Sequence, residues 1–477
     1  MPGIVDGLPN IWGNQKRIKK LTSQKKDHYI PFSNIDFSQV QSAFGIALHM
    51  HQPTIPAGSD TLETAPLISN LQYMIEHQDI GDNHNAPVFL QCYRRISDFI
   101  RELVAGGHNP RVMLDYSGNL LWGLHQMGEK KVLDDLKLIT SDKKYFPFVE
   151  WLGTMWSHAV VSSTPVPDIK LHIRAWQEHF ASIFGLNALE RVKGFSPPEM
   201  HLPIHPDVCF EYIKALRECG YEWLMVQEHT IEMVDGSGLN PYLPHKLVAK
   251  NSLGEIQEII VLIKTQGSDT KLVAQMQPYY EAKTKQREDC SGKSIPPFVL
   301  QIGDGENGGV MMNEFPSMYN QVFAEVTKTG VVSMNGSEYL EFIKSVGLTI
   351  DDLKSVQPIH QHQIWEFISK PKQGAADQAI EAAKEKYPGF SLDRASWTND
   401  KNWVQGYQDV LDPMNTLSVE FHKRFDNKQV DYNDPIYRKA LVYLLLSQTS
   451  CFRYWGSGSW TDYAKEICRR GIEALKK

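Results

Sequence analysis

Two carboxylate residues follow short apolar segments of the sequence and could act as a catalytic pair. Glu199 lies in the run GFSPPEMHLP at 194–203, and Asp304 lies between two glycines in FVLQIGDGE at 298–306. The two prolines before Glu199 fix their own backbone angles and cannot donate to a sheet, so a stiff turn must present this side chain. Read alone, such a turn also fits a strand end beside a solvated glutamate. Two carboxylates on different strands are the minimum equipment for glycoside hydrolysis, in which one attacks or activates water and the other protonates the leaving oxygen.

Histidines suggest a competing chemistry. His49 and His51 follow the apolar segment 44–48 with HxH spacing and would point the same way, because side chains alternate along a strand. Together with Asp304 they could bind a divalent metal ion that activates water. Against this, GDGE has no ordered ligand spacing and HxH often occurs by chance. We therefore predict no metal and no other cofactor, and keep a metal-dependent hydrolase that uses His49, His51 and Asp304 as the alternative. Further histidines near the predicted site are His158, His201 and His205.

Short apolar segments recur along the first two thirds of the chain and alternate mostly with helical patterns. The predicted strands are 44–48, 112–115, 148–152, 192–195, 223–226, 259–263 and 298–302. Strands this short and apolar, separated by helices, indicate a parallel sheet covered on both faces. Seven such units favour a closed or nearly closed (β/α) barrel, with the polar residues after each strand gathered at one end.

The pattern predicts three regions. Residues 1–40 show no clear period and are predicted to form an extension over the barrel surface. Residues 41–350 carry the barrel, and residues 351–477 show helical segments with hardly any strand signal. We therefore predict an α-helical carboxyl-terminal domain packed against the barrel.

Composition limits the class of partner. The chain has 477 residues with a net charge of -7, which argues against a nucleic acid or an anionic membrane as partner. No apolar run approaches the roughly 20 residues that a membrane-spanning helix needs. The six cysteines show no CxxC pair, so we expect reduced thiols in a cytoplasmic protein.

Five motifs in order resemble glycoside hydrolase family 57. They are LHMHQP at 48–53, WLGTMWSHAV at 151–160, GFSPPEMHL at 194–202, IGDGENGG at 302–309 and QTSCFRYWG at 448–456. The resemblance implies an incomplete, TIM-barrel-like (β/α)7 barrel with a helical carboxyl-terminal region. It also implies a retaining enzyme that acts on α-glucans, α-1,4-linked above all, without a metal.

Matched residue by residue, the resemblance assigns roles within this sequence. Glu199 stands at the position of the catalytic nucleophile and Asp304 at that of the general acid/base. The implied substrate-binding residues are His49, His51, His158 and Trp455. The expected substrate is an oligosaccharide or polysaccharide.

The last motif departs from the family pattern. Many members carry an acidic residue and more tryptophan there, where this chain has Ser450, Cys451, Phe452 and Arg453. The departure leaves open the linkage, the chain length and the choice between hydrolysis, as in an α-amylase, and transfer, as in a 4-α-glucanotransferase. Some relatives lack one catalytic carboxylate, so a non-catalytic glucan-binding protein is a third reading; both carboxylates are present here, which favours an enzyme. The sequence does not predict an oligomeric state.

Overall fold

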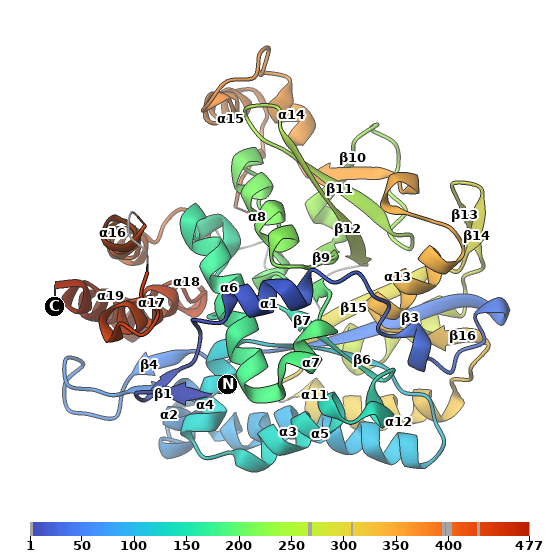
Figure 1. Cartoon of the computed structure of the whole chain (residues 1–477), viewed down its shortest axis with the longest axis horizontal. Coiled ribbons are helices and arrows are strands. Elements are labelled where there is room, and N and C mark those ends of the chain that lie inside the picture. Colours follow the sequence, from blue (N-terminus) through green and yellow to red (C-terminus); the bar gives the residue numbers. More distant parts are fainter. Residues whose placement is uncertain are drawn as a thin grey trace.

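A closed ring of seven parallel strands forms the centre of the molecule (Figure 1). The computed structural model describes residues 3–265, 270–306, 309–393, 396, 403–426 and 430–476, so Asn307 and Gly308 of the fourth motif lie outside the described residues. In ring order the strands are β3 (Val40–Met50), β6 (Val112–Tyr116), β7 (Val149–Gly153), β8 (Gly194–Phe195), β9 (Trp223–Gln227), β12 (Ile256–Lys264) and β15 (Phe298–Asp304), which returns to β3. The predicted (β/α)7 barrel is confirmed.

The extent of strand pairing differs around the ring. β15 and β3 pair over their full shared length, from Phe298 opposite Ala43 to Asp304 opposite His49. β12 and β15 pair only at Lys264 and Leu300, so a single residue pair closes the ring there. β8 has only two residues, because the prolines that follow it cannot continue the ladder.

Four further strands, which the sequence pattern did not predict, extend the sheet beyond the ring. β16 (Gly330–Ser333) pairs with the first half of β3. On the other side β11 (His245–Lys250), β17 (Ser355–Pro358) and β10 (Ile231–Met233) continue outward from β12. β17 falls in the region predicted to be helical; with four residues it is too short to give a recognisable alternation.

Helices surround the ring. The first half of the barrel is covered by α3 (Ala86–Ala105), α4 (Gly118–Gln126), α5 (Lys130–Ser141) and α6 (Val166–Phe184). The second half is covered by α8 (Pro206–Glu218), α12 (Phe315–Glu325) and α13 (Gly336–Ser345). The core is mainly apolar and includes the fully buried rings of Trp156 and Trp176.

The carboxyl-terminal helices form two groups. α16 (Gln408–Phe425), α17 (Pro435–Ser447), α18 (Cys451–Tyr454) and α19 (Ser459–Lys476) lie beside α6, at the left of Figure 1. Buried Asp168 of α6 fastens them, because its two oxygens contact His422 Nε2 at 2.6 Å and Gln448 Nε2 at 2.6 Å. α14 (Gln361–Trp365) and α15 (Ala375–Lys386) lie apart at the top of Figure 1, where Gln361 Nε2 donates to the carbonyl of Ile204. The three-region division of the chain stays a prediction.

The amino-terminal segment follows the barrel surface. It contains β1 (Ile4–Val5), β2 (Leu8–Pro9) and α1 (Gln15–Thr22). The backbone amide of Asn14 donates to Glu178 of α6 at 2.6 Å. Glu341 of α13 accepts three successive backbone amides, those of residues 28–30, at 2.6 to 2.9 Å.

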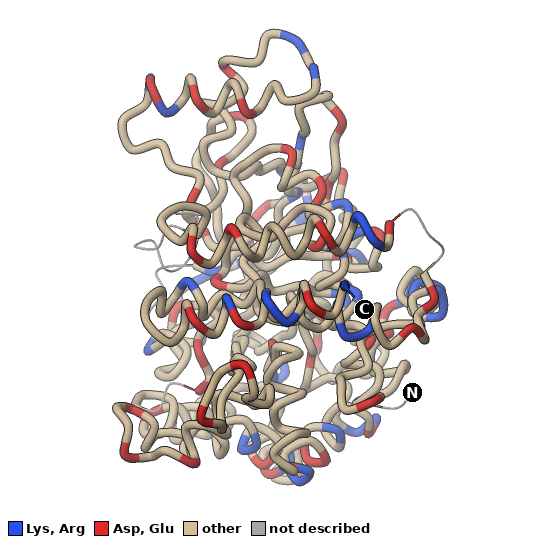
Figure 2. Tube along the Cα trace, turned by 90° about the vertical axis from the view of Figure 1, so that its left-hand side faces the viewer, with Lys and Arg blue, Asp and Glu red and all other residues tan. Residues whose placement is uncertain are grey.

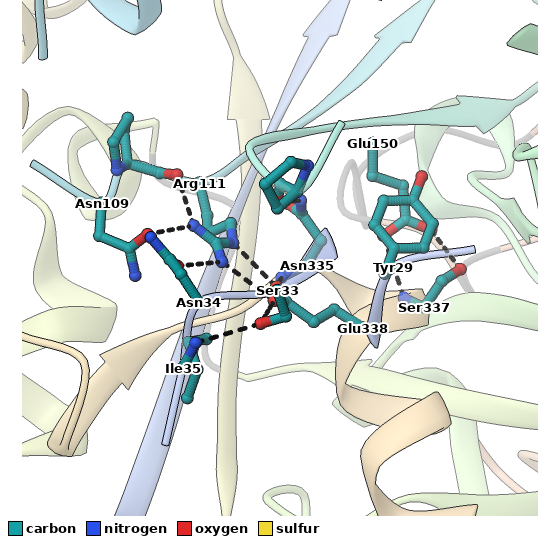
Figure 3. A network of polar contacts seen from close by, with 12 residues as sticks. Tyr29, Ser33, Asn34, Ile35, Asn109, Arg111, Glu150, Asn335, Ser337 and Glu338 are labelled. Carbon is teal, nitrogen blue, oxygen red and sulfur yellow. Dashed lines mark hydrogen bonds and ion pairs between the residues drawn. The ribbon is translucent and has the colours of Figure 1, made fainter. Parts of the chain in front are cut away.

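A buried polar network ties this segment to the amino-terminal end of the barrel (Figure 3). The fully buried Arg111, just before β6, donates to both oxygens of Glu338 in α13 at 2.8 and 3.0 Å. It also donates to Asn109 at 2.9 Å, and Ser33 donates to Glu338 at 2.6 Å. Nearby, the backbone amide and the hydroxyl of Ser337 donate to buried Glu150 of β7. These contacts lie at the opposite end of the barrel from the polar residues at the carboxyl ends of the strands, such as His49 and Asp304.

Charges of both signs are interspersed over the face formed by the carboxyl-terminal helices (Figure 2). Along α19, Arg469 and Arg470 both pair with Glu466. Within the described ranges, no helix combines the length and the apolar character needed to cross a membrane. All six cysteines are unpaired.

Candidate active site

Three histidines meet at the carboxyl-terminal end of the barrel. His49 is the next-to-last residue of β3, His51 directly follows this strand, and His158 comes from the loop after β7. The ring of His158 lies 4.6 Å from that of His49 and stacks on that of His51 at 4.3 Å, centroid to centroid. All three side chains are buried. The structure therefore brings together the three histidines that the sequence predicted to share a site.

Each histidine ring is held through Nδ1 by a different element. His49 donates to Asp115 of β6 at 2.9 Å, and His51 lies 2.7 Å from the hydroxyl of Ser117. His158 lies 2.6 Å from the hydroxyl of Ser450, in the turn before α18. Fixing Nδ1 in this way orients the ring.

The three rings differ in charge. Burial acts to lower the pKa of His49, but the charge and hydrogen bond of Asp115, with smaller effects of Asp304 and Glu306, raise it to about 9. Burial, helped by the charge of His49, lowers the pKa of His51 well below its usual value. Burial and the other two histidines do the same to His158. Near neutral pH the cluster therefore holds one imidazolium and two neutral imidazoles.

Asp304 lies beside His49 at the end of β15, directly opposite it in the β3–β15 ladder. Burial raises the pKa of Asp304, His49 lowers it and Asp115 raises it further. Two residues on, Glu306 accepts the backbone amide of His51 at 3.3 Å. Burial raises the pKa of Glu306 to about 8 against the lowering effect of Tyr93, and the charge of Asp304 adds to the rise. Both carboxyl groups thus have a raised pKa, and that of Glu306 lies above neutral pH.

Glu199 occupies a strained turn after β8. Its φ is +58° and that of Met200 is +50°, in the left-handed region that non-glycine residues rarely adopt. The turn is closed by the amide of Met200, which donates to the Pro197 carbonyl at 3.0 Å, and by that of His201, which donates to Pro198 at 3.1 Å. Strain of this kind costs of order 1–3 kcal/mol and concentrates at functional sites. The stiff turn predicted from the two prolines holds a buried glutamate at the same end of the barrel as Asp304.

The segment before and within α18 closes the site from the helical region. Cys451 Sγ lies 3.5 Å from His51 Nε2. Burial raises the pKa of the Cys451 thiol, and the charge of Glu199 adds to this effect. Burial lowers the pKa of Arg453 to about 10, while Glu199 is among the groups that favour its charged form. Glu199 thus lies within electrostatic reach of both side chains.

Trp455 is placed differently from the other predicted site residues. Its side chain is 56% exposed, at the carboxyl end of α18. Its ring stacks on Trp460 at 6.2 Å and meets Tyr454 edge to face at 5.0 Å. A contribution to substrate binding stays a prediction for this residue.

Sequence reasoning placed Glu306 among the polar residues at the strand ends, but it did not select Asp115, Ser117 or Ser450 as site residues. One signal in the sequence could have identified Asp115. It lies within the otherwise apolar strand VMLDY, and burying a charged side chain is costly unless a hydrogen-bonding or oppositely charged partner lies beside it. Ser450 gave no such signal because its partner, His158, is 292 residues away in the chain.

The metal alternative gains no support from the geometry. In the part of the chain that the structure describes, no group of three or more histidine, cysteine, aspartate or glutamate side chains is arranged to hold a metal ion. His201 and His205, the other histidines considered, are not part of the three-histidine cluster: His201 is buried directly after the Glu199 turn, and His205 caps the amino terminus of α8.

A protein-family model matches the first half of the chain. The family described as "Glycosyl hydrolase family 57" matches residues 10–259, which is more than half of the chain. No curated protein matches the sequence.

Solved structures share the fold at low sequence identity. The 4-α-glucanotransferase of Thermococcus litoralis aligns over 92% of this chain with a TM-score of 0.56 and 17% identity; the alignment covers 60% of that enzyme. The exo-type maltose-forming amylase of Pyrococcus sp. ST04 aligns over 91% of this chain and 72% of its own, with a TM-score of 0.51 and 11% identity. The family 57-type branching enzyme of Pyrococcus horikoshii aligns over 90% of this chain and 88% of its own, with a TM-score of 0.50 and 11% identity. The chain therefore spans about three fifths of the length of the glucanotransferase.

Proposed function

The chain belongs to glycoside hydrolase family 57, and from this premise we propose that it is a retaining enzyme that cleaves or transfers α-glucosidic bonds in oligosaccharides or polysaccharides. An α-1,4-glucan is the proposed substrate. The similar structures named above are a glucanotransferase, an amylase and a branching enzyme, which supports an α-glucan without choosing between water and a sugar as acceptor.

One observation carries the proposal: two carboxyl groups lie at the same end of one barrel in contrasting surroundings. Asp304 has a raised pKa because it is buried, so it can hold a proton for the leaving group. Glu199 is held by a strained turn within reach of the Arg453 cation, which favours its carboxylate form. A pair in which one member is an acid and the other a fixed carboxylate suits retaining hydrolysis.

In the first step the Glu199 carboxylate attacks the anomeric carbon of the bound sugar. The glycosidic carbon–oxygen bond breaks, and the proton of Asp304 moves to the departing oxygen. This leaves a glycosyl ester on Glu199 and a carboxylate on Asp304. The rigid turn limits the orientational freedom that Glu199 would otherwise lose in the attack.

In the second step water or a sugar hydroxyl attacks the same carbon from the opposite side. Its proton passes to the Asp304 carboxylate, and the bond to Glu199 breaks. Two inversions give net retention, and both carboxyl groups return to their starting state. The three histidines are proposed to hydrogen-bond the sugar at the cleavage point, with Trp455 further out.

Chemical rescue by azide tests the two roles separately. With an α-glucosyl fluoride as substrate, Glu199→Ala leaves room for azide on the face opposite the fluoride, and the expected product is the β-glucosyl azide. Asp304→Ala still forms the Glu199 ester, which azide attacks to give the α-glucosyl azide. Without azide, each variant should lose turnover of maltooligosaccharides by a factor of about 10⁴ or more.

The control is Glu211→Ala, which removes a glutamate on the exposed surface of α8. It should behave as the wild type in every arm. Normal turnover by the Glu199 variant, or an α-azide from it, would remove Glu199 from the proposed role. A wild-type enzyme that loses activity with chelator would favour the metal-dependent alternative instead.

A further inference from the structure

His49 stands between two carboxylates in adjacent strands. In the β3–β6 ladder it is directly opposite Asp115, and in the β3–β15 ladder it is directly opposite Asp304. Residues opposite one another in parallel strands present their side chains to the same face of the sheet. The three side chains therefore form a row across the strand ends.

Asp115 is committed to His49. Its side chain is fully buried, and its Oδ2 accepts the Nδ1–H of His49 at 2.9 Å. Its other oxygen has no hydrogen-bond partner among the residues that the structure describes. A buried carboxylate left without a cationic partner is costly, so the pair is stable only while His49 is charged.

The other titratable groups that face His49 do not replace Asp115 as its anionic partner. His51 lies directly after β3 and His158 in the loop after β7, and both are neutral near pH 7 because burial lowers their pKa. From the end of β15 come Asp304 and Glu306, and the pKa of Glu306 is raised to about 8, which keeps it protonated. Asp115 is therefore the group that holds the charge on His49.

We propose that Asp115 is a positioning residue for the reaction: it fixes the His49 ring as an imidazolium beside Asp304, where this cation stabilises the carboxylate that Asp304 becomes when it gives up its proton. The inference rests on the proposed function, in which Asp304 is the acid. The interaction is stronger after proton transfer than before it, because Asp304 gains its negative charge in that step. The interaction therefore lowers the activation free energy of the proton-transfer step and does not simply tighten substrate binding.

Leaving-group dependence separates this role from a structural one. The fluoride ion of a glucosyl fluoride departs without help from an acid. The departing sugar oxygen of a maltooligosaccharide, in contrast, needs the proton of Asp304. Asp115→Asn keeps the shape of the side chain and removes its charge. We expect kcat/KM for maltooligosaccharide to fall about 100-fold, while kcat/KM for the fluoride changes by less than about 3-fold. General structural damage would lower both to the same extent.

A direct measurement of the histidine provides a second readout. The ¹³Cε1 resonance of His49, assigned by its absence in His49→Gln, should titrate near pH 9 in the wild type and at least one unit lower in Asp115→Asn. Asp168→Asn is the matched control, since it removes the charge of another buried aspartate that contacts a histidine, on the outside of the barrel. It should change neither the substrate ratio nor the titration of His49.

Two results would overturn the inference: an equal loss on both substrates, or an unchanged titration of His49 in Asp115→Asn. If Asp115→Asn does not fold, His49→Gln must give the same split between the two substrates. Failure of the proposed function is distinguishable, because a wild-type enzyme that forms no product from either substrate would reject the reaction itself, whereas the titration would still report on the ion pair.

Discussion

His158 Nδ1 and Ser450 Oγ lie 2.6 Å apart although 292 residues separate them in the chain. Backbone contacts join the same two segments: the amide of Ser450 donates to the carbonyl of His158 at 3.2 Å, and residues 159 and 449 form an isolated β-bridge. The histidine cluster of the barrel is thus completed by the helical region. A barrel without that region would lack the partner of one of its three site histidines.

Loss of this link should impair catalysis more than stability. In Ser450→Ala the His158 ring loses the hydrogen bond that orients it, and we expect kcat/KM on maltooligosaccharides to fall about 10-fold. The urea midpoint should shift little, because the backbone contacts remain. Ser457→Ala, in the exposed turn after α18, serves as the control and should leave the rate unchanged. A stability loss that parallels the rate loss would mean that the bond holds the helical region to the barrel and does not orient the ring.

Arg453 should influence the acid side of the pH–rate profile. Its side chain is fully buried, its Nε and Nη1 find no hydrogen-bond partner in the described residues, and the groups whose charges act on it are Cys451, Tyr407 and Glu199. Of these only Glu199 carries a carboxyl group. Because a nearby cation favours the carboxylate, Arg453→Met should move the acid edge of kcat/KM upward by about one pH unit.

Arg453→Lys provides the test of charge against packing. It keeps the positive charge and should restore most of the wild-type acid edge, even if turnover stays reduced. A profile in which both variants keep the wild-type edge would show that the guanidinium does not act on the group titrated there.

The stability difference between the wild type and Glu150→Gln should depend on pH. Burial raises the pKa of this glutamate in β7 to about 8, although the bonds from Ser337 act to lower it. The folded protein therefore binds a proton that the unfolded chain releases near pH 4.5, so the contribution to stability is full below that pH and is lost as the pH rises through about 8. Glu150→Gln removes this dependence. Its urea midpoint relative to the wild type should rise between pH 5 and pH 9, whereas that of the exposed Glu211→Gln should not.

The barrel and the location of its site follow from the sequence for a simple reason. Each ring strand is an apolar segment, and parallel strands bring their carboxyl ends to one side of the sheet. Knowing the segments before Glu199, Asp304 and His49 was therefore enough to predict that these residues lie at the same end of the barrel. The resemblance of five motifs to family 57 supplied the roles, which the residues alone could not.

What the sequence could not predict depends on register and on distant packing. The row of Asp115, His49 and Asp304 requires two strand registers to agree to the residue, and a shift of one residue would turn the side chains to opposite faces. The His158–Ser450 contact depends on how the helical region docks on α6. β16 and β17, with four residues each, are shorter than the window in which a strand pattern can be recognised.

The ion pair of Arg111 and Glu338 should matter for stability alone. Both side chains, drawn in Figure 3, are fully buried at the amino-terminal end of the barrel, whereas the histidine cluster lies at its carboxyl-terminal end. Arg111→Met leaves the Glu338 carboxylate without its cation, and the free energy of unfolding should fall by about 3–5 kcal/mol, measured by urea denaturation. Arg94→Met breaks pairs with Asp98 and Asp135 on a half-exposed surface and should cost at most about 1 kcal/mol. The rate per folded molecule should be unchanged in both variants. A cost below about 1 kcal/mol for Arg111→Met would mean that water or a rearranged side chain replaces the guanidinium, and a reduced rate would show that the two ends of the barrel are coupled.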